Sequence, residues 1–200
     1  MRDKEDRRLN GPVITLRGEK VGLGPIRRED AVVFIKWLND PEVTRNLGML
    51  SRAGRITAED EERWFDRYAH DKDSVTFGIY ELASNRLIGD CGLSGVDYVQ
   101  RTAEFGILIG AKDCWNKGFG TEATMLTLDY GFNILGLHNI MLTVYAHNLR
   151  GLLAYEKAGF KVFGRRREAR RVAGEVSDVV YMDVLASEFQ SPVLKNLLKP

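Results

Sequence analysis

The sequence contains few cysteines, no long apolar run and no excess of one charge sign, and each absence excludes a class of protein. Two cysteines and three histidines without ligand spacing argue against a zinc site and a disulfide framework, so we expect a reducing, cytoplasmic compartment. No apolar run approaches the roughly 18 residues needed to cross a bilayer, and the charged residues 1–10 lack the apolar stretch of a secretory signal. With 29 basic and 28 acidic side chains, the net charge of +1 argues against a dedicated nucleic-acid binder.

The patterns that are present indicate one globular domain of the α/β class. The 200 residues are 44% hydrophobic and 28% charged, which suits a single packed core. Helix patterns come first, then three successive strands, then alternating strands and helices, which is typical of a mixed α+β fold. We expect residues 1–10 to form a flexible charged arm, 11–186 the domain and 187–200 a tail. Helices are expected near 28–39, 57–68, 119–135 and 148–159, and strands near 13–17, 21–25, 75–80, 87–94, 103–109, 140–145 and 179–185.

One segment, residues 107–122, has the character of an anion-binding site. Its sequence, ILIGAKDCWNKGFGTE, runs from a strand through a loop to Gly118 and Gly120, where a helix begins. Backbone N–H groups at a helix N-terminus are unpaired, and glycines allow phosphate oxygens to approach them. Lys117 adds a positive charge. By themselves, the two glycines are equally compatible with a simple turn of the chain.

A second segment, VYAHNLRGLLAYEKAGF, places a polar side chain and a phenol on one helix face. Asn148 is a good N-cap residue, and Tyr155 lies two turns further along the helix. Tyr155 is therefore either a core aromatic residue with a bonded hydroxyl or a proton donor directed into a cleft.

Together these segments resemble the Gcn5-related N-acetyltransferase (GNAT) superfamily over about residues 11–186, and in detail its RimJ/RimL branch. The strings that carry the resemblance are WLNDPEVTRNL, AEFGILIG, WNKGFGTEA and NLRGLLAYEKAGF. The resemblance implies a single, strongly twisted, mostly antiparallel sheet with helices on both faces. It also implies that two central strands splay apart and that acetyl-CoA, as co-substrate, enters between them without a metal ion.

The resemblance further implies a role for each motif residue. Backbone groups along the 105–109 strand would pair with the pantetheine arm, Asn148 would hydrogen-bond it, and Tyr155 would protonate the departing thiolate. The family motif usually opens with Gln or Arg, and this chain has Trp115 there, which removes one charged contact to the phosphates. The implied cofactor-binding residues are Phe105, Ile107, Leu108, Ile109, Asn116, Lys117, Gly118, Phe119, Gly120, Thr121, Asn148 and Tyr155.

The general base is open among three candidates. An amine that attacks a thioester needs a proton acceptor. Glu104 opens a strand where the family often places a carboxylate, and it is our first catalytic candidate beside Tyr155, although strand alternation equally predicts an exposed side chain. Glu168, expected in the loop before the last strand, is a weaker candidate, and a chain of water molecules is the third.

Two charged runs bear on the acceptor amine. The run RRREARR, from Arg165 to Arg171, is either solvated or an anion-binding rim, and such a rim would repel polyamines. The run EDEE, from Glu59 to Glu62, either favours a helix N-terminus or lines an inner pocket for a cation. The acceptor is therefore left open between a protein N-terminal α-amine and a small-molecule amine such as an amino sugar, an aminoglycoside or an amino acid.

We therefore predict a cytoplasmic N-acetyltransferase that moves the acetyl group directly from acetyl-CoA to a primary amine, since neither cysteine is placed like a nucleophile. The alternative is a non-catalytic CoA-binding sensor or a ribosome-docking module on the same fold. No membrane or direct nucleic-acid role is expected. The apolar side chains of the tail would pack either across a homodimer or onto their own chain; they are Val193, Leu194, Leu197 and Leu198.

Overall fold

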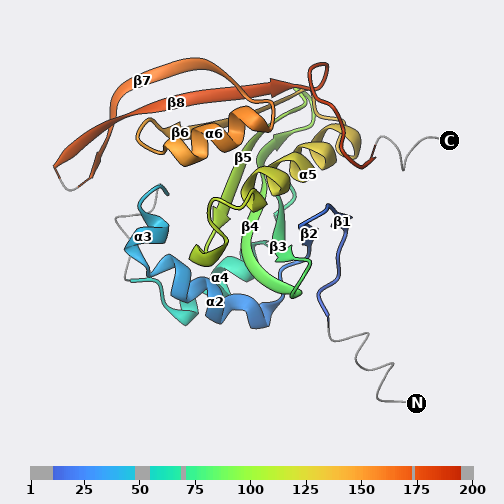
Figure 1. Cartoon of the computed structure of the whole chain (residues 1–200), viewed down its shortest axis with the longest axis vertical. Helices are drawn as coiled ribbons and strands as arrows, with labels where there is room; N and C mark the ends of the chain where they lie inside the picture. Colours follow the sequence, from blue (N-terminus) through green and yellow to red (C-terminus); the bar gives the residue numbers. More distant parts are fainter. Residues whose placement is uncertain (1–10, 48–54, 69–70, 173, 195–200) are drawn as a thin grey trace.

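The computed structural model describes residues 11–47, 55–68, 71–172 and 174–194. Their strands form one eight-stranded sheet in the order β1-β2-β3-β4-β5-β6-β8-β7 (Figure 1). All neighbouring strands are antiparallel except β5 and β6, which confirms the mostly antiparallel sheet. The strands are β1 (Leu16–Arg17), β2 (Val21–Gly24), β3 (Val75–Glu81), β4 (Arg86–Asp97), β5 (Thr102–Ile109), β6 (Asn139–Tyr145), β7 (Lys161–Val172) and β8 (Glu175–Leu185).

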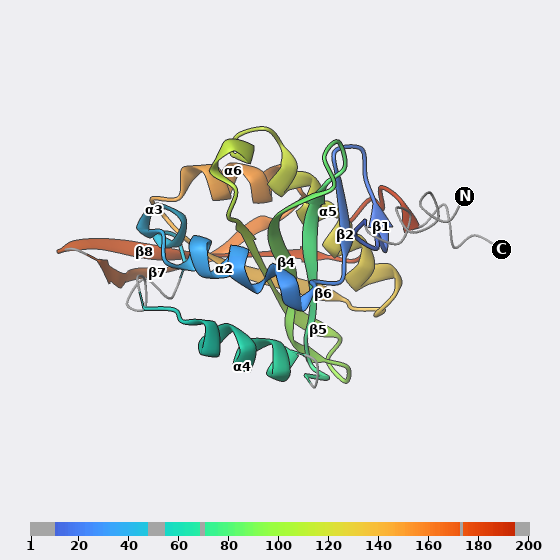
Figure 2. The same ribbon diagram turned by 90° about the horizontal axis from the view of Figure 1, so that it is seen from below.

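Helices cover both faces of this sheet, as the family resemblance implies. Helix α5 packs on β2, β4 and β5 and contacts α6, whereas α2 packs against α3 and α4. Figure 2 shows α4 and α6 on opposite sides of β4 and β5. Among the residues described, no helix is both long and apolar enough to span a bilayer. The helices are α2 (Ala31–Leu38), α3 (Pro41–Thr44), α4 (Ala58–Tyr68), α5 (Phe119–Asn133) and α6 (Leu149–Lys157), with 3-10 turns η1 (Arg28–Asp30) and η3 (Lys112–Cys114).

The two central strands β5 and β6 separate soon after they pair. Their parallel register covers only the three β5 residues from Thr102 to Glu104. Beyond that point β5 remains paired with β4 as far as Ile109. In the described part of the chain, the backbone of residues 105–109 therefore has no strand partner on its β6 side. This is the splay that the family resemblance implies.

Local capping signals in the sequence are confirmed by the structure. Thr57 and Asp60 form a reciprocal capping box at the start of α4, since the Asp60 amide donates to Thr57 Oγ1 at 3.3 Å and the Thr57 amide donates to Asp60 Oδ2 at 3.0 Å. Asn148 caps α6, where its Oδ1 accepts from the Gly151 amide at 3.1 Å. The predicted first helix is shorter than expected, because a 3-10 turn precedes Ala31.

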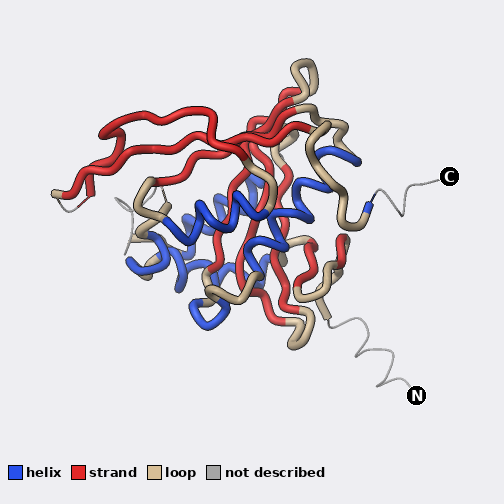
Figure 3. The backbone as a smooth tube through the Cα atoms, turned by 45° about the horizontal axis from the view of Figure 1, so that its top comes forward, coloured by secondary structure: helices blue, strands red, loops and turns tan. Residues whose placement is uncertain are grey.

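Strand β7 is an element that the sequence reasoning missed. The arginine-rich segment expected as a loop is instead a long strand that pairs with β8, and β8 itself begins at Glu175 rather than Val179. Figure 3 shows the resulting two-stranded hairpin extending past the helices. Its polar side chains give no hydrophobic alternation, so the strand depends on pairing with β8 rather than on a pattern of its own.

The C-terminal segment is held by one buried carboxylate. Asp129 in α5 is fully buried and accepts hydrogen bonds from the amides of Val193 and Leu194 at 3.0 and 2.8 Å. Leu194 is itself buried, and Phe189 packs on Phe132 with ring centroids 5.2 Å apart. The described part of the tail therefore packs onto its own chain. The predicted arm (residues 1–10), Leu197 and Leu198 lie outside the described residues.

Candidate active site

Two cavities meet at strand β5, one on each side of the sheet opening. The smaller, which we call the Gly118 cavity, has a volume of about 390 Å³ and lies between β5, the loop before α5, and α6. The larger, which we call the Asp90 cavity, has a volume of about 1440 Å³ and lies among α2, α4, β3, β4 and β5. Ile107, Leu108 and Leu47 line both. A ligand in one cavity can therefore reach a ligand in the other at this strand.

Most of the predicted cofactor-binding residues line the Gly118 cavity. Two do not: Phe105 is buried in the core, and Lys117 is exposed, with its carbonyl accepting from Lys20 Nζ at 3.2 Å. The predicted residues that the structure brings together there are Ile107, Leu108, Ile109, Asn116, Gly118, Phe119, Gly120, Thr121, Asn148 and Tyr155.

The glycines stand at the start of helix α5, whose first residues, 119–121, line this cavity. Gly118 is the N-cap and adopts a φ of 86°, a left-handed conformation in which a side chain would be strained. A side-chain carbon on Gly120 would lie 3.6 Å from Ile109, in ordinary contact, so the cavity has room there. Glu122 in the first turn is occupied elsewhere, because its carboxylate accepts from the amides of Glu19 and Lys20.

The surroundings of Tyr155 are compatible with both of the roles that the sequence left open. Its ring packs edge-on against Phe105 and Phe160, with centroids 6.2 and 6.0 Å away. Its side chain also lines the Gly118 cavity, and no hydrogen bond to its hydroxyl occurs within the described residues. Burial raises the pKa of the phenol to about 12, partly offset by the charge of Arg150. The phenol therefore stays protonated around neutral pH and available as a donor.

The charges that line the Gly118 cavity are all positive. Arg150 and Lys157 line it, and none of its described lining residues is an Asp or Glu. The Arg150 guanidinium carbon lies 3.9 Å from the centroid of the Trp115 ring. Trp115 is fixed in turn, because its indole N–H donates to the Ile109 carbonyl at 2.7 Å.

The Asp90 cavity has the opposite character, with five carboxylates and two arginines among its lining residues. Some of these carboxylates are paired, such as Asp66, which binds Arg28 at 2.7 Å. Asp90 and Glu61 make no ion pair or side-chain hydrogen bond with any described residue. Burial, with the nearby charge of Glu61, raises the pKa of Asp90 to about 7. Burial and the charge of Asp60 raise the pKa of Glu61.

Neither carboxylate proposed as base from the sequence reaches a cavity. Glu104 is exposed and lines neither, and its Oε1 accepts from Thr143 Oγ1 at 3.5 Å. Glu168 is exposed and lies within β7 rather than in a loop, where it has a φ of 51° and its amide donates to Asp178 Oδ1 at 2.8 Å. The sequence reasoning missed Asp90, although a charged residue inside the apolar strand LIGDCGL was a usable signal.

Cys114 lines the Gly118 cavity but is poorly suited to carry an acyl group. Burial, together with the charge of Asp113, raises the pKa of its thiol, and only the thiolate is a good nucleophile. Cys91, in β4, is buried, and its Sγ lies 3.1 Å from Oγ1 of Thr127 in α5. Within the described residues, no group of three potential metal ligands occurs.

Sequence comparison identifies the family that this geometry suggests. The model of the acetyltransferase (GNAT) domain matches residues 20–161 of the chain. The chain belongs to the GNAT family of acetyltransferases. The predicted enzyme class, an acyl-CoA-dependent N-acetyltransferase, is therefore confirmed, while the RimJ/RimL branch stays a prediction.

Several relatives of this GNAT protein are known. A spermidine N(1)-acetyltransferase of Vibrio cholerae is 35% identical over 128 residues, which is 64% of this chain and 73% of that protein. An uncharacterized N-acetyltransferase, p20, of Bacillus licheniformis is 28% identical over 88% of this chain and 98% of its own length. The crystal structure of Vibrio cholerae spermidine N-acetyltransferase in complex with CoA and spermine has a TM-score of 0.77 to this chain, at 28% identity, over 86% of this chain and 98% of that one.

Proposed function

We propose that this enzyme transfers the acetyl group of acetyl-CoA to a small, positively charged amine of the polyamine class. The observation that carries the proposal is the opposite charge of two cavities that meet at Ile107 and Leu108. The positive Gly118 cavity suits a phosphorylated co-substrate, and the acidic Asp90 cavity suits a cation. Relatives named as spermidine N-acetyltransferases support the same acceptor class.

The residues of the Gly118 cavity fit acetyl-CoA. The first amides of α5 and the side chains Arg150 and Lys157 offer donors and positive charge to phosphate groups. The unpaired backbone of residues 105–109 offers an edge to the amides of the pantetheine arm, with Asn148 beside it. When bound, acetyl-CoA supplies an activated acyl group next to Tyr155.

The residues of the Asp90 cavity fit the amine and its proton. An ammonium substrate must lose two protons before the amide product is complete. Asp90 accepts one and passes it to water, since a carboxyl group with a pKa of about 7 is a stronger base than an ordinary aspartate. The Tyr155 hydroxyl gives its proton to the departing sulfur, and the second ammonium proton returns to the Tyr155 phenolate through water. The amine nitrogen bonds to the carbonyl carbon, and the carbon–sulfur bond breaks.

The arginine run, which by its sequence argues against polyamines, lines neither cavity. Arg165 is paired with Asp178 at 2.7 Å, and Arg170 donates to the Leu47 carbonyl at 3.4 Å. Arg170 therefore approaches the Asp90 cavity at Leu47, where its guanidinium donates to a backbone carbonyl. The remaining candidates, a protein N-terminus or a CoA-binding module without activity, become outcomes of the test. The proposal keeps the expected cytoplasmic location.

Thiol release from acetyl-CoA by the purified chain tests the proposal. The acceptors are spermidine, spermine, an aminoglycoside, an amino sugar, an amino acid and an N-terminal peptide, each with the Asp90→Asn variant as control. We expect the highest kcat/KM with a polyamine, and loss of most of it in the variant. Turnover of the peptide alone, or CoA binding without any turnover, contradicts the proposal.

A further inference from the structure

We infer that Arg150, held on the face of Trp115, is a phosphate-binding cation of the Gly118 cavity, so that α6 supplies a positive charge in place of the one missing at position 115. The inference rests on the proposed binding of acetyl-CoA in this cavity. It adds a ligand-binding role for Arg150 and a positioning role for Trp115.

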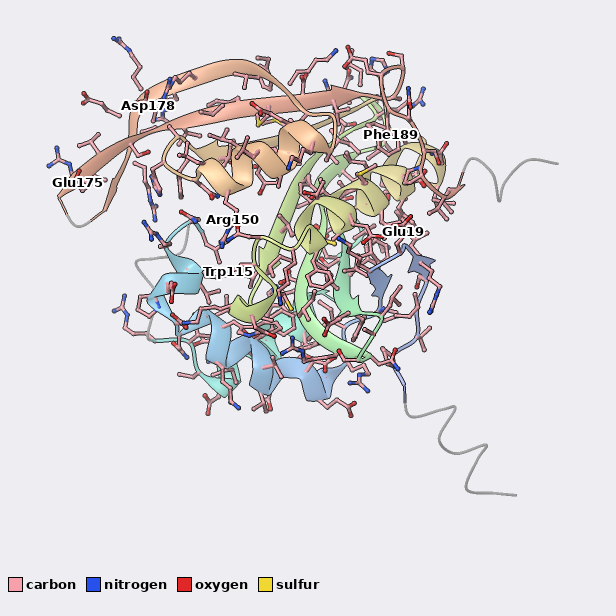
Figure 4. All side chains as sticks on the ribbon, viewed as in Figure 1. Glu19, Trp115, Arg150, Glu175, Asp178 and Phe189 are labelled. Carbon is pink, nitrogen blue, oxygen red and sulfur yellow. The ribbon has the colours of Figure 1, made fainter. Side chains whose placement is uncertain are left out.

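The position of Arg150 is set by two contacts in series. Ile109, in the edge strand of the opening, accepts the indole N–H of Trp115 at 2.7 Å. The guanidinium of Arg150 then lies 3.9 Å from the Trp115 ring centroid, and Figure 4 shows Arg150 reaching from α6 toward Trp115. A guanidinium stacked in this way keeps its N–H edge free for a bidentate contact with a phosphate. The stack is therefore a fixed platform beside the first amides of α5.

The charge of Arg150 is not balanced by the protein. No described carboxylate forms an ion pair with it, and the pKa of Arg150 is lowered, first by its partial burial and then by the nearby charge of Arg45. Glu42, which acts in the opposite direction, is bound by Lys112 at 2.9 Å. An anion placed between Arg150 and the α5 amides would relieve this imbalance. Phosphate is the anion that acetyl-CoA carries.

A purely structural stack would give a different result from a phosphate contact. If Arg150 only fastened α6 to the loop, its loss would lower stability and weaken every ligand of the cavity alike. A phosphate contact makes the loss depend on the phosphate content of the ligand. Calorimetric Kd values for CoA, 3′-dephospho-CoA and pantetheine separate the two cases.

We expect Arg150→Gln to weaken CoA binding by about 10- to 100-fold, the range of a hydrogen bond to a charged group, and to leave pantetheine unchanged. Arg150→Lys should fall between, since it keeps the charge but loses the planar fork. Arg166→Gln is the matched control for net charge, because Arg166 is exposed and lines neither cavity. If Arg150→Gln loses affinity equally for CoA and 3′-dephospho-CoA, Arg150 binds the pyrophosphate. If it loses affinity for CoA alone, Arg150 binds the 3′-phosphate.

An unchanged CoA affinity in Arg150→Gln, or a loss that pantetheine shares, overturns this inference and leaves the proposed function standing. Failure of the wild-type chain to bind CoA overturns the proposed function and the inference together. Partial recovery of CoA affinity when Trp115→Arg is added to Arg150→Gln would give independent support, because it returns a cation from the loop side.

Discussion

Asp90 and Leu108 are register partners across β4 and β5, and Leu108 lines both cavities while Asp90 lines only the acidic one. This pairing places an unpaired carboxylate beside the strand where the sheet opens. Under the proposed function, a group at this point lies next to the place where the acyl donor and the amine meet. The pairing thus connects the fold to the proposed proton transfer.

The Asp90→Asn variant should lose activity and gain stability at high pH. Because the folded-state pKa of Asp90 is raised to about 7 from its ordinary value of 3.8, its ionisation destabilises the folded state as pH rises through this window. The variant escapes this cost, so it should exceed the wild type in unfolding free energy at pH 8 by at most about 4 kcal/mol, with little difference below pH 4. Urea unfolding at several pH values measures this, and a less stable variant at pH 8 would count against it.

The Glu61→Gln variant is the control for this titration. The acidic limb of the wild-type rate–pH profile should lie near the pKa of Asp90, with activity falling as pH drops below about 7. Since the charge of Glu61 raises the pKa of Asp90, its removal should move the limb to lower pH. A limb that stays in place would show that another group controls it.

Substitutions at Gly120 should distinguish the effect of charge from the effect of added volume at the start of α5, where we propose that the phosphates of CoA bind. Gly120→Asp should weaken CoA binding by more than about tenfold, because it puts a negative charge among the first amides of α5. The same charge is favourable to the helix N-terminus, so folding should survive. Gly120→Ala is the matched control, since its added carbon meets Ile109 only at 3.6 Å. Equal calorimetric affinities of the two variants for CoA would show that its phosphates do not bind at the start of α5.

The Tyr155→Phe variant should lower kcat by about 100-fold and change the KM for acetyl-CoA much less. The phenylalanine ring keeps the edge-on contacts with Phe105 and Phe160, so only the hydroxyl is tested. Steady-state kinetics with acetyl-CoA as the varied substrate provides both constants. A parallel change in kcat and KM, or an early loss of the folded state on heating, would indicate a structural role.

The Asp129→Asn variant should weaken the attachment of the C-terminal segment to α5. The carboxylate accepts from the amides of Val193 and Leu194 and from Asn133 and Ser191, and an amide side chain supports fewer of these bonds. We expect a loss of about 1–3 kcal/mol in the free energy of unfolding. Ser191→Ala, which removes one of these partners, should cost less. Equal losses would show that the hydroxyl bond accounts for the whole effect.

The fold could be predicted from the sequence further than the site could. Apolar periodicity and capping residues such as Thr57 and Asn148 act locally, so they place α4, α6 and most strands correctly. Strand β7 was not predicted, because the residues that pair with β8 show no hydrophobic alternation. The same holds for the site. Motif residues near the glycines gather as expected, because they are close in the chain.

The residues that escaped prediction depend on contacts between distant segments. The pKa of Asp90 depends on the charge of Glu61 in α4, and Arg150 stacks on Trp115, 35 positions earlier in the chain. Glu104 was favoured by its position at a strand start, but it ends on the exposed side. Which face of the sheet a helix covers decides whether a carboxylate is solvated or perturbed, and sequence spacing does not contain that information.

A crystal structure of the chain with CoA and spermidine tests the central claim most directly. We expect the CoA phosphates beside the first amides of α5 and the thiol near Tyr155. A spermidine nitrogen should lie in the Asp90 cavity within about 3 Å of the Asp90 carboxylate or of one bridging water. Spermidine bound outside the Asp90 cavity, or CoA bound away from the Gly118 cavity, would contradict the account.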